Sequence, residues 1–325
     1  MNRPVLLALL LALLAALLLS LLAGKVWVPP SVLFAPLAAD DPRGLIILEL
    51  RLPRTLLAAL IGAGLGLSGA VMQGYLRNPL ADPGLFGVSA SAALGAVLSF
   101  YLGAAAMVWA LPVLALAGAG VAMALLVLLV GRSGSLLLFT LAGVIISTLA
   151  GALTALAISL APTPFATAQI ITWLMGALTD RSWQDVKLAL PLIALGSLIL
   201  AMTARPLDAL TLGDVAARSM GVDTQRLQRL VVLGVGLCVG ASVATAGVIG
   251  FVGLIVPHLV RPLAGHRPSA VLLPSALAGA LLLLLADSLV RVALLESELR
   301  LGIAMSLLGA PFFLWLMFRL RRRLP

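Results

Sequence analysis

Charged residues are scarce in this chain. Asp, Glu, Lys and Arg make up only 10% of its 325 residues, whereas 62% are apolar. A soluble domain carries about 25% charged residues, so too little polar material is present to cover a water-facing surface. The apolar runs are long and continuous, unlike the short alternating segments of a β-barrel. We therefore predict an all-α, polytopic membrane protein, because a helix satisfies its own backbone in lipid.

Metal-binding, disulfide-forming and nucleotide-binding residues are also scarce. One Cys and two His exclude a disulfide framework and metal-site spacing, so no metal ligand is predicted. Cys238 lies in an apolar run and is expected to be buried and inert. The two lysines, Lys25 and Lys187, stand outside any glycine-rich phosphate loop. We predict no ATP site, no cofactor and no catalytic residue in this chain.

Ionisable residues are almost absent within the apolar runs, which argues against an ion-coupled secondary carrier. Asp287 alone lies near the interior of a run, one helical turn from Arg291. A local ion pair near a helix end is its predicted role. An ion-coupled secondary transporter, or another kind of polytopic membrane protein, remains the alternative interpretation.

The sequence contains about ten hydrophobic units. They cover residues 5–23, 55–76, 85–105, 107–130, 136–160, 188–204, 230–248, 250–264, 270–291 and 301–319. The first is long for the core of a cleaved signal peptide, which favours a retained helix. The eighth is short and rich in Gly and Pro, which predicts a broken or partly penetrating helix. The segment 166–178 is too short to span and is predicted to be re-entrant or interfacial.

An even number of crossings places both termini on one side of the membrane. The arginine-rich tail at 319–323 marks that side as cytoplasmic, and most of the 21 Lys and Arg then fall inside. This bias accounts for the net charge of +9 without nucleic acid as a partner. Several arginines nevertheless fall outside, among them Arg51, Arg54 and Arg291, and they call for an explanation of their own.

The longest cytoplasmic loop covers residues 205–229. Thr211 or Asp214 is expected to cap a short helix that ends at Gly221, and Asp223 or Thr224 to cap a second one. Two short amphipathic helices at this face suit the docking of a partner protein, and an ordinary interfacial loop is the alternative.

Six motifs, in order and over nearly the whole chain, closely resemble the FecCD-type permeases. They are RLPR at 51–54, GLSGAVMQ at 66–73, RNPLADPGLFGVS at 77–89, GVIGFVGLIVPHLVR at 247–261, LADSLVR at 285–291 and GAPFF at 309–313. These permeases are the membrane subunits of type II ABC importers for iron chelates, haem or cobalamin.

The resemblance implies one transmembrane domain over 1–325, with the cytoplasmic coupling loop 205–229 inside it. It further implies a homodimer in the inner membrane, two ATPase subunits that bind ATP and Mg, and a periplasmic substrate-binding protein. A ferric siderophore ranks first as the substrate because that class is the most numerous, with haem or cobalamin as alternatives.

In the family, arginines on the periplasmic face receive acidic residues from the binding protein. Arg51, Arg54 and Arg291 match those positions, which would explain cations kept outside. The planar fork of Arg suits this role, since it can hold a carboxylate by two hydrogen bonds. The alternative is that these arginines anchor helix ends in the headgroup region.

On the cytoplasmic side, the coupling helices of the family match residues 212–221. Asp214, Arg218, Ser219 and Gly221 would then face the ATPase, whereas a lipid contact is the alternative for Arg218. The place of segment 163–176 stays open. The family position indicates the cytoplasmic gate, and the helix count puts the segment outside.

Two further motifs are interpreted as structural. Asn78, Pro79 and Asp82 form a stiff polar turn that proline keeps out of helix. Pro257 and His258 resemble the family signature at the cytoplasmic end of the eighth helix, where the His is structural rather than a ligand. One departure concerns the ELRLG sequence at 298–302, in which Arg300 stands where the family commonly has Pro.

Overall fold

The protein is described here by a computed structural model covering residues 3–24, 27–33, 41–104, 107, 109–131, 135–293 and 299–321. Within these residues every regular element is a helix, which confirms the predicted all-α class. The α-helices are α1 (Arg3–Leu22), α2 (Pro42–Leu45), α3 (Leu52–Tyr75), α4 (Val88–Tyr101), α5 (Ala110–Val130), α6 (Leu136–Ser159), α7 (Pro164–Leu174), α8 (Trp183–Ala201), α9 (Ala204–Leu210), α10 (Asp214–Ser219), α11 (Thr224–Ala246), α12 (Val252–Ala264), α13 (Pro268–Val292) and α14 (Leu301–Arg321). Short 3-10 turns η1 (Pro30–Leu33) and η3 (Pro83–Phe86) and a π-helical turn η2 (Ile46–Arg51) complete the set.

Each of the ten predicted hydrophobic units corresponds to a helix. Among the described residues, eight helical segments are long and apolar enough to cross a membrane. The other two units form α4 and α12, which are shorter. A short eighth unit was predicted, whereas the third unit, predicted over 85–105, forms a helix only over Val88–Tyr101. The positive φ of 79° at Gly87 delays the start of α4, so part of that unit forms the preceding turn.

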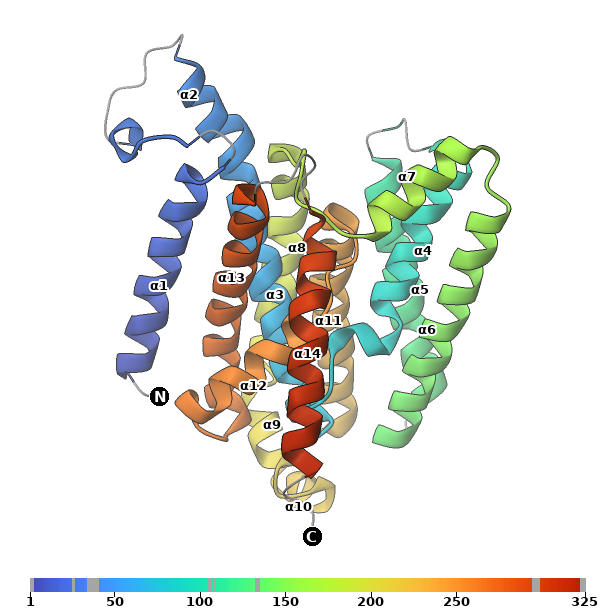
Figure 1. The fold of residues 1–325 in the computed structure, drawn as a ribbon. Helices are drawn as coiled ribbons and strands as arrows, with labels where there is room; N and C mark the ends of the chain where they lie inside the picture. The colour runs from blue at the N-terminus through green and yellow to red at the C-terminus, as the bar shows by residue number, and fades with distance from the viewer. Residues whose placement is uncertain are drawn as a thin grey trace.

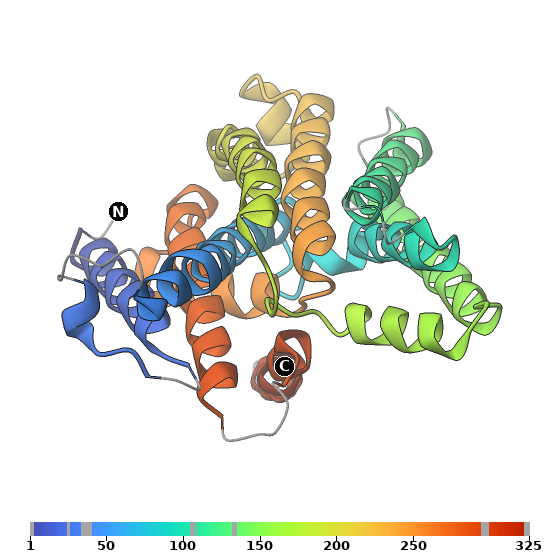
Figure 2. The same cartoon turned by 90° about the horizontal axis from the view of Figure 1, so that it is seen from above.

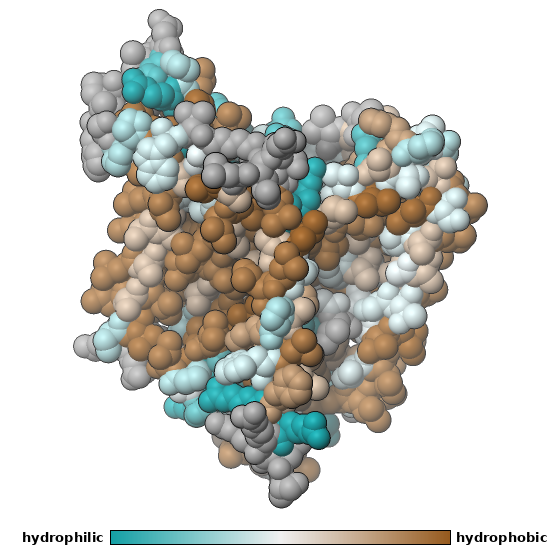
Figure 3. Space-filling model, viewed as in Figure 1, coloured by the Kyte–Doolittle hydropathy of each residue, from teal (hydrophilic) through white to brown (hydrophobic). Residues whose placement is uncertain are grey.

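The long helices run between two ends of the bundle (Figure 1). α2 and α7 lie at one end, which we call the outer end, and α9 and α10 lie at the other, which we call the inner end. α1 begins and α14 ends toward the inner end, as the even helix count predicts. Hydrophobic residues cover the middle of the visible face, and hydrophilic residues gather at its ends (Figure 3). This distribution fits a bundle that crosses a bilayer.

The position of α7 resolves the open question about segment 163–176. α7 lies at the outer end, opposite α10 (Figure 1), which agrees with the helix count and not with a place at the same end as the loop 205–229. The physical reason is simple. α6 is long enough to carry the chain from one end to the other, and Pro164 then starts a new helix after a sharp change of direction.

α3 and α11 form the centre of the bundle. Buried residues make up 78% of the span window in each, against 28% in α5 and α14 and 17% in α1. Seen from above, α1 and the α5–α6 pair lie at opposite edges with α3 and α11 between them (Figure 2). α3 packs closely on α13 at two glycines. A Cβ at Gly62 would collide with the backbone carbonyl of Gly279, and a Cβ at Gly279 would collide with that of Gly62. Small residues permit such close helix packing in lipid.

Candidate functional sites at the two ends of the bundle

At the outer end, a buried carboxylate binds two arginines. Asp287 of α13 has no exposed surface. Arg54 Nε of α3 donates to both carboxylate oxygens, at 3.0 and 3.1 Å, and Arg54 Nη2 lies 2.9 Å from Oδ1. Arg291 Nε lies 3.1 Å from Asp287 Oδ2, one turn along α13. The predicted pair of Asp287 and Arg291 is confirmed, but no pattern in the sequence indicated that Arg54 joins it from 233 residues away.

The arginines also bind the end of α1. Arg51 Nη1 donates to the carbonyl oxygens of Leu21 and Leu22 at 3.0 and 2.7 Å. Arg291 Nη2 donates to the hydroxyl of Ser20 at 2.6 Å. The last carbonyls of a helix have no partner within it and carry partial negative charge, so cations are favourable there. The three predicted docking arginines therefore converge on one place, where α1, α3 and α13 meet.

These arginines are more deeply set than a surface docking site requires. The exposed fractions of Arg51, Arg54 and Arg291 are 8%, 9% and 4%. The side chain of Arg54 keeps an exposed fraction of 11%, which is the part that an incoming group could reach. Docking itself is not observed and stays a prediction, to which the structure adds a second role as internal ties.

At the inner end, the loop 205–229 folds differently from the prediction in one respect. α10 begins after Gly213, so Asp214 is its first helical residue rather than its cap. Gly221, with a φ of 85°, ends the helix as predicted. Asp223 accepts hydrogen bonds from the first backbone amides of α11, so the expected second short helix is the start of that long one. The other short helix is α9, which precedes α10.

α10 presents exposed side chains at the inner end. Asp214 forms an ion pair with Arg77, which follows α3, at 3.3 Å. Arg218 and Ser219 are exposed, and the Ser219 hydroxyl donates to the carbonyl of Val215. Three apolar side chains around this helix are also exposed, namely Leu212 at 66%, Val215 at 81% and Met220 at 63%. We call Leu212, Val215 and Met220 the α10 patch. A mixed apolar and charged surface of this kind suits a protein partner.

Asp208 of α9 holds the start of α13. Its carboxylate accepts from the backbone amide and hydroxyl of Ser269, at 2.9 and 2.6 Å, and from Arg267 at 3.0 Å. Partial burial raises the pKa of Asp208, but the hydrogen bonds from Ser269 and Arg267 outweigh it, so the pKa lies below its usual value of 3.8. The helix that is tied to α3 at the outer end is therefore tied to α9 at the inner end.

The two motifs interpreted as structural make local contacts. The Asn78 side chain accepts from the backbone amide of Leu80 at 2.9 Å, and Asp82 accepts from Gly84 at 2.7 Å, on either side of Pro79. Such bonds shape turns.

Pro257 is buried inside α12. The ring of His258 packs edge-to-face on Phe312 of α14, with 5.8 Å between ring centroids. This ring contact of His258 packs α12 against α14.

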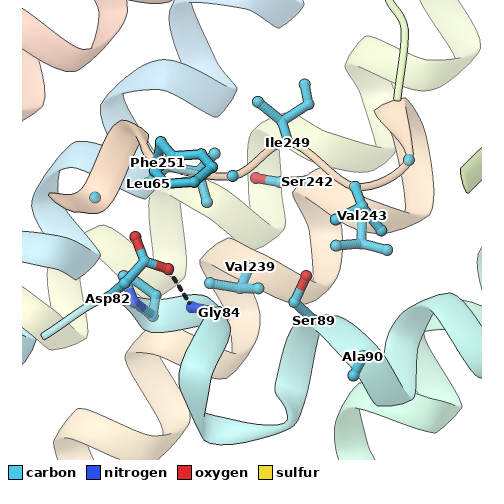
Figure 4. A pocket seen from close by; sticks show the side chains of 15 residues that line it. Leu65, Asp82, Gly84, Ser89, Ala90, Val239, Ser242, Val243, Ile249 and Phe251 are labelled. Carbon is cyan, nitrogen blue, oxygen red and sulfur yellow. Dashed lines mark hydrogen bonds between the residues drawn. The ribbon is translucent and has the colours of Figure 1, made fainter. Parts of the chain in front are cut away.

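A cavity of about 230 Å³ lies inside the bundle, where α4 and α12 begin (Figure 4). Its lining comes from α3, from the start of α4 and the turn before it, from α11, and from the start of α12 and the segment before it. The lining residues are Leu65, Asp82, Pro83, Gly84, Ser89, Ala90, Val239, Ser242, Val243, residues 247–251 and Gly253. Most of these side chains are small or apolar. Sequence reasoning missed the cavity, although the Gly- and Pro-rich stretches that enclose it were noted.

The chain matches the FecCD transport family over residues 11–319. The vitamin B12 import system permease protein BtuC of Citrobacter koseri is 41% identical over 303 residues, covering 92% of this chain and 89% of the relative. Its counterpart in Escherichia coli O9:H4 is 42% identical over 303 residues, covering 92% and 90%.

A solved metal-chelate type ABC transporter in an inward-facing conformation is similar with a TM-score of 0.88 and 33% identity, covering 98% of this chain and 100% of that one. The structure of PsaBC from Streptococcus pneumoniae, with a TM-score of 0.58 and 20% identity over 85% of this chain and 94% of that one, shares the fold.

The multi-span helical bundle and the family match over nearly the whole chain define a membrane transport subunit. This chain belongs to the FecCD transport family. It is a permease of an ABC importer and serves transport rather than catalysis.

Proposed function

We propose that this permease imports cobalamin across the inner membrane. The observation that carries the proposal is the identity of 41–42% to vitamin B12 import permeases over 92% of the chain. It changes the substrate order expected from the motifs alone, which placed a ferric siderophore first. The motifs are shared by permeases for several chelates, so they could not separate the substrates, whereas whole-chain similarity weighs every position.

The proposed assembly is a homodimer with two ATPase subunits at the inner end and a periplasmic binding protein at the outer end. Arg51, Arg54 and Arg291 support the outer contact, because guanidinium groups suit carboxylate recognition. The α10 patch supports the inner contact, since exposed apolar side chains gain by being covered. ATP and Mg would bind to the ATPase subunits, and no cofactor is proposed for this chain.

In the proposed cycle, the binding protein delivers the substrate to the outer end. ATP binding brings the ATPase subunits together, and their movement reaches the bundle through α9 and α10. Asp214 would pass it to Arg77 and hence to the end of α3, and Asp208 would pass it to the start of α13. A pathway with small and apolar walls, like those of the interior cavity, would hold a bulky substrate weakly enough to release it.

Transport by the reconstituted complex tests this proposal. The permease, a partner ATPase and a periplasmic cobalamin-binding protein are combined in proteoliposomes, and ATP-dependent uptake of labelled cyanocobalamin is compared with uptake of a labelled ferric siderophore. The expected result is cobalamin uptake that a non-hydrolysable ATP analogue abolishes. Siderophore uptake without cobalamin uptake would overturn the substrate assignment.

A second arm of this experiment, with the permease alone, tests the alternative of an ion-coupled carrier. Uptake by the permease alone, driven by an imposed proton or sodium gradient and without ATP, would overturn the ABC mechanism. We expect no such uptake, because Asp287, the buried carboxylate of α13, is bound to two arginines rather than arranged as an ion relay.

A further inference from the structure

Asp287 stands out among the ionisable groups that the proposed function does not use. It lies in a membrane helix with no exposed surface, where a carboxylate is costly unless its charge is paired and its oxygens are hydrogen-bonded. Both oxygens accept hydrogen bonds from Arg54, and Oδ2 also lies 3.1 Å from Arg291 Nε. One carboxylate thereby pairs with two guanidinium groups that come from different helices.

Without this carboxylate, the two cations would repel each other in a region of low dielectric. Asp287 offsets that repulsion and sets the direction of the Arg54 fork. The contact with Arg54 uses its Nε and Nη2, so the guanidinium plane is set by the carboxylate. Arg291 is fixed further by its Nη2 contact to Ser20, whose hydroxyl lies 2.8 Å from that of Thr55. The four residues around the carboxylate are each at least nine-tenths buried, namely Arg54, Arg291, Ser20 and Thr55.

We propose that Asp287 is a positioning residue for the binding-protein dock: it holds Arg54 by hydrogen bonds and Arg291 by an ion pair, so that carboxylates of the binding protein can engage these cations. This inference rests on the proposed function of the arginines, and it assigns to α13 an internal anion that the docking surface requires. A preorganised cation binds a carboxylate more tightly than a mobile one, since less side-chain freedom is lost on binding.

The sign of the effect separates positioning from long-range attraction. Asp287→Asn keeps the shape of the side chain and makes the outer end more positive, so a purely long-range role predicts tighter docking of an acidic partner. A positioning role predicts weaker docking, by about tenfold if roughly 1.4 kcal/mol of interaction is lost. The measurement is the affinity of a purified cobalamin-binding protein for the permease–ATPase complex in nanodiscs. Asp185→Asn at the start of α8 is the matched charge control, and we expect it not to weaken docking.

A double-mutant cycle separates positioning from a general structural role. In the Arg54→Gln, Arg291→Gln background, Asp287→Asn should weaken docking no further, because its effect acts through those arginines. An equal loss in both backgrounds, or tighter or unchanged docking by Asp287→Asn alone, overturns the inference. If both arginine substitutions leave docking unchanged, the proposed dock itself fails, which is a distinct result.

A milder substitution keeps the test informative if Asp287→Asn does not yield folded protein. Ser20→Ala removes the buried hydroxyl that accepts from Arg291 while leaving the carboxylate in place. We expect a several-fold weaker affinity for the binding protein in the native background. In the background lacking the arginines, we expect Ser20→Ala to weaken the affinity no further. An unchanged affinity in the native background counts against positioning.

Discussion

α13 is held by a carboxylate at each of its ends, and the two ends are built differently. At the outer end, Asp287 is fully buried and binds Arg54 and Arg291. At the inner end, Asp208 binds Ser269 and an Arg267 side chain that is 80% exposed. Buried charge pairs resist disruption because removing one partner leaves an unpaired charge, whereas exposed pairs exchange easily with water. The outer end is thus built to keep its geometry and the inner end to change its contacts.

The largest expected effect comes from breaking the outer cluster. Asp287→Leu should lower the free energy of unfolding by about 3–5 kcal/mol, because it leaves two buried cations without their carboxylate. Replacing all three groups, by Arg54→Met, Asp287→Leu and Arg291→Met, should recover most of that loss, since well-packed apolar side chains can replace a buried ion cluster. The measurement is the thermal unfolding midpoint in detergent.

The triple variant also separates stability from function. It should be folded and yet fail to bind the periplasmic binding protein, because it lacks two of the three cations of the dock. A triple variant as unstable as Asp287→Leu alone would contradict the view that the unpaired charges cause the loss.

The next largest effect concerns the helix contact that joins the two ends. Gly62→Leu should destabilise the bundle by about 1–3 kcal/mol or more through overpacking, because even a Cβ would collide with the carbonyl of Gly279. Gly120→Leu in α5 is the matched control, since no atom lies within 4 Å of the position of its Cβ. Thermal unfolding of both variants measures the difference, and equal midpoints would refute the close contact of α3 with α13.

The sequence predicted the helices well because each long apolar run is a local signal. It predicted the pair of Asp287 with Arg291 because those residues are one turn apart on one helix. It could not predict that Arg54 joins them or that Asp208 reaches Ser269, because these contacts depend on which helices pack together. The helix of the third unit is shorter than the unit for a local reason, since Gly87 and the turn before it take residues from the apolar run.

A smaller effect is expected at Asp208. Its pKa is lowered in the folded protein, so its contribution to stability is complete above the unfolded pKa of about 3.8 and is lost as the pH falls below that value toward the folded pKa. Asp208→Asn should therefore destabilise the bundle at neutral pH by about 1–2 kcal/mol, and the difference from the native chain should shrink below pH of about 3.8. Unfolding midpoints of both proteins across this pH range test the sign, and a difference that grows on acidification would contradict it.

The smallest effect on stability is expected where the proposed effect on function is large. Asp214 and Arg77 form an exposed pair, with side chains 50% and 37% exposed, so Asp214→Ala should cost about 0–1 kcal/mol. The same substitution should lower the stimulation of ATP hydrolysis by the loaded binding protein, since α10 would lose its tie to the end of α3.

Val215→Asp, in the α10 patch, should instead weaken association with the ATPase, because a charge replaces an apolar side chain that is 81% exposed. Pull-down and hydrolysis assays on both variants distinguish a lost tie from a lost contact. If Asp214→Ala leaves stimulation unchanged while Val215→Asp abolishes association, the signal from the inner end travels through Asp208 and α13 alone.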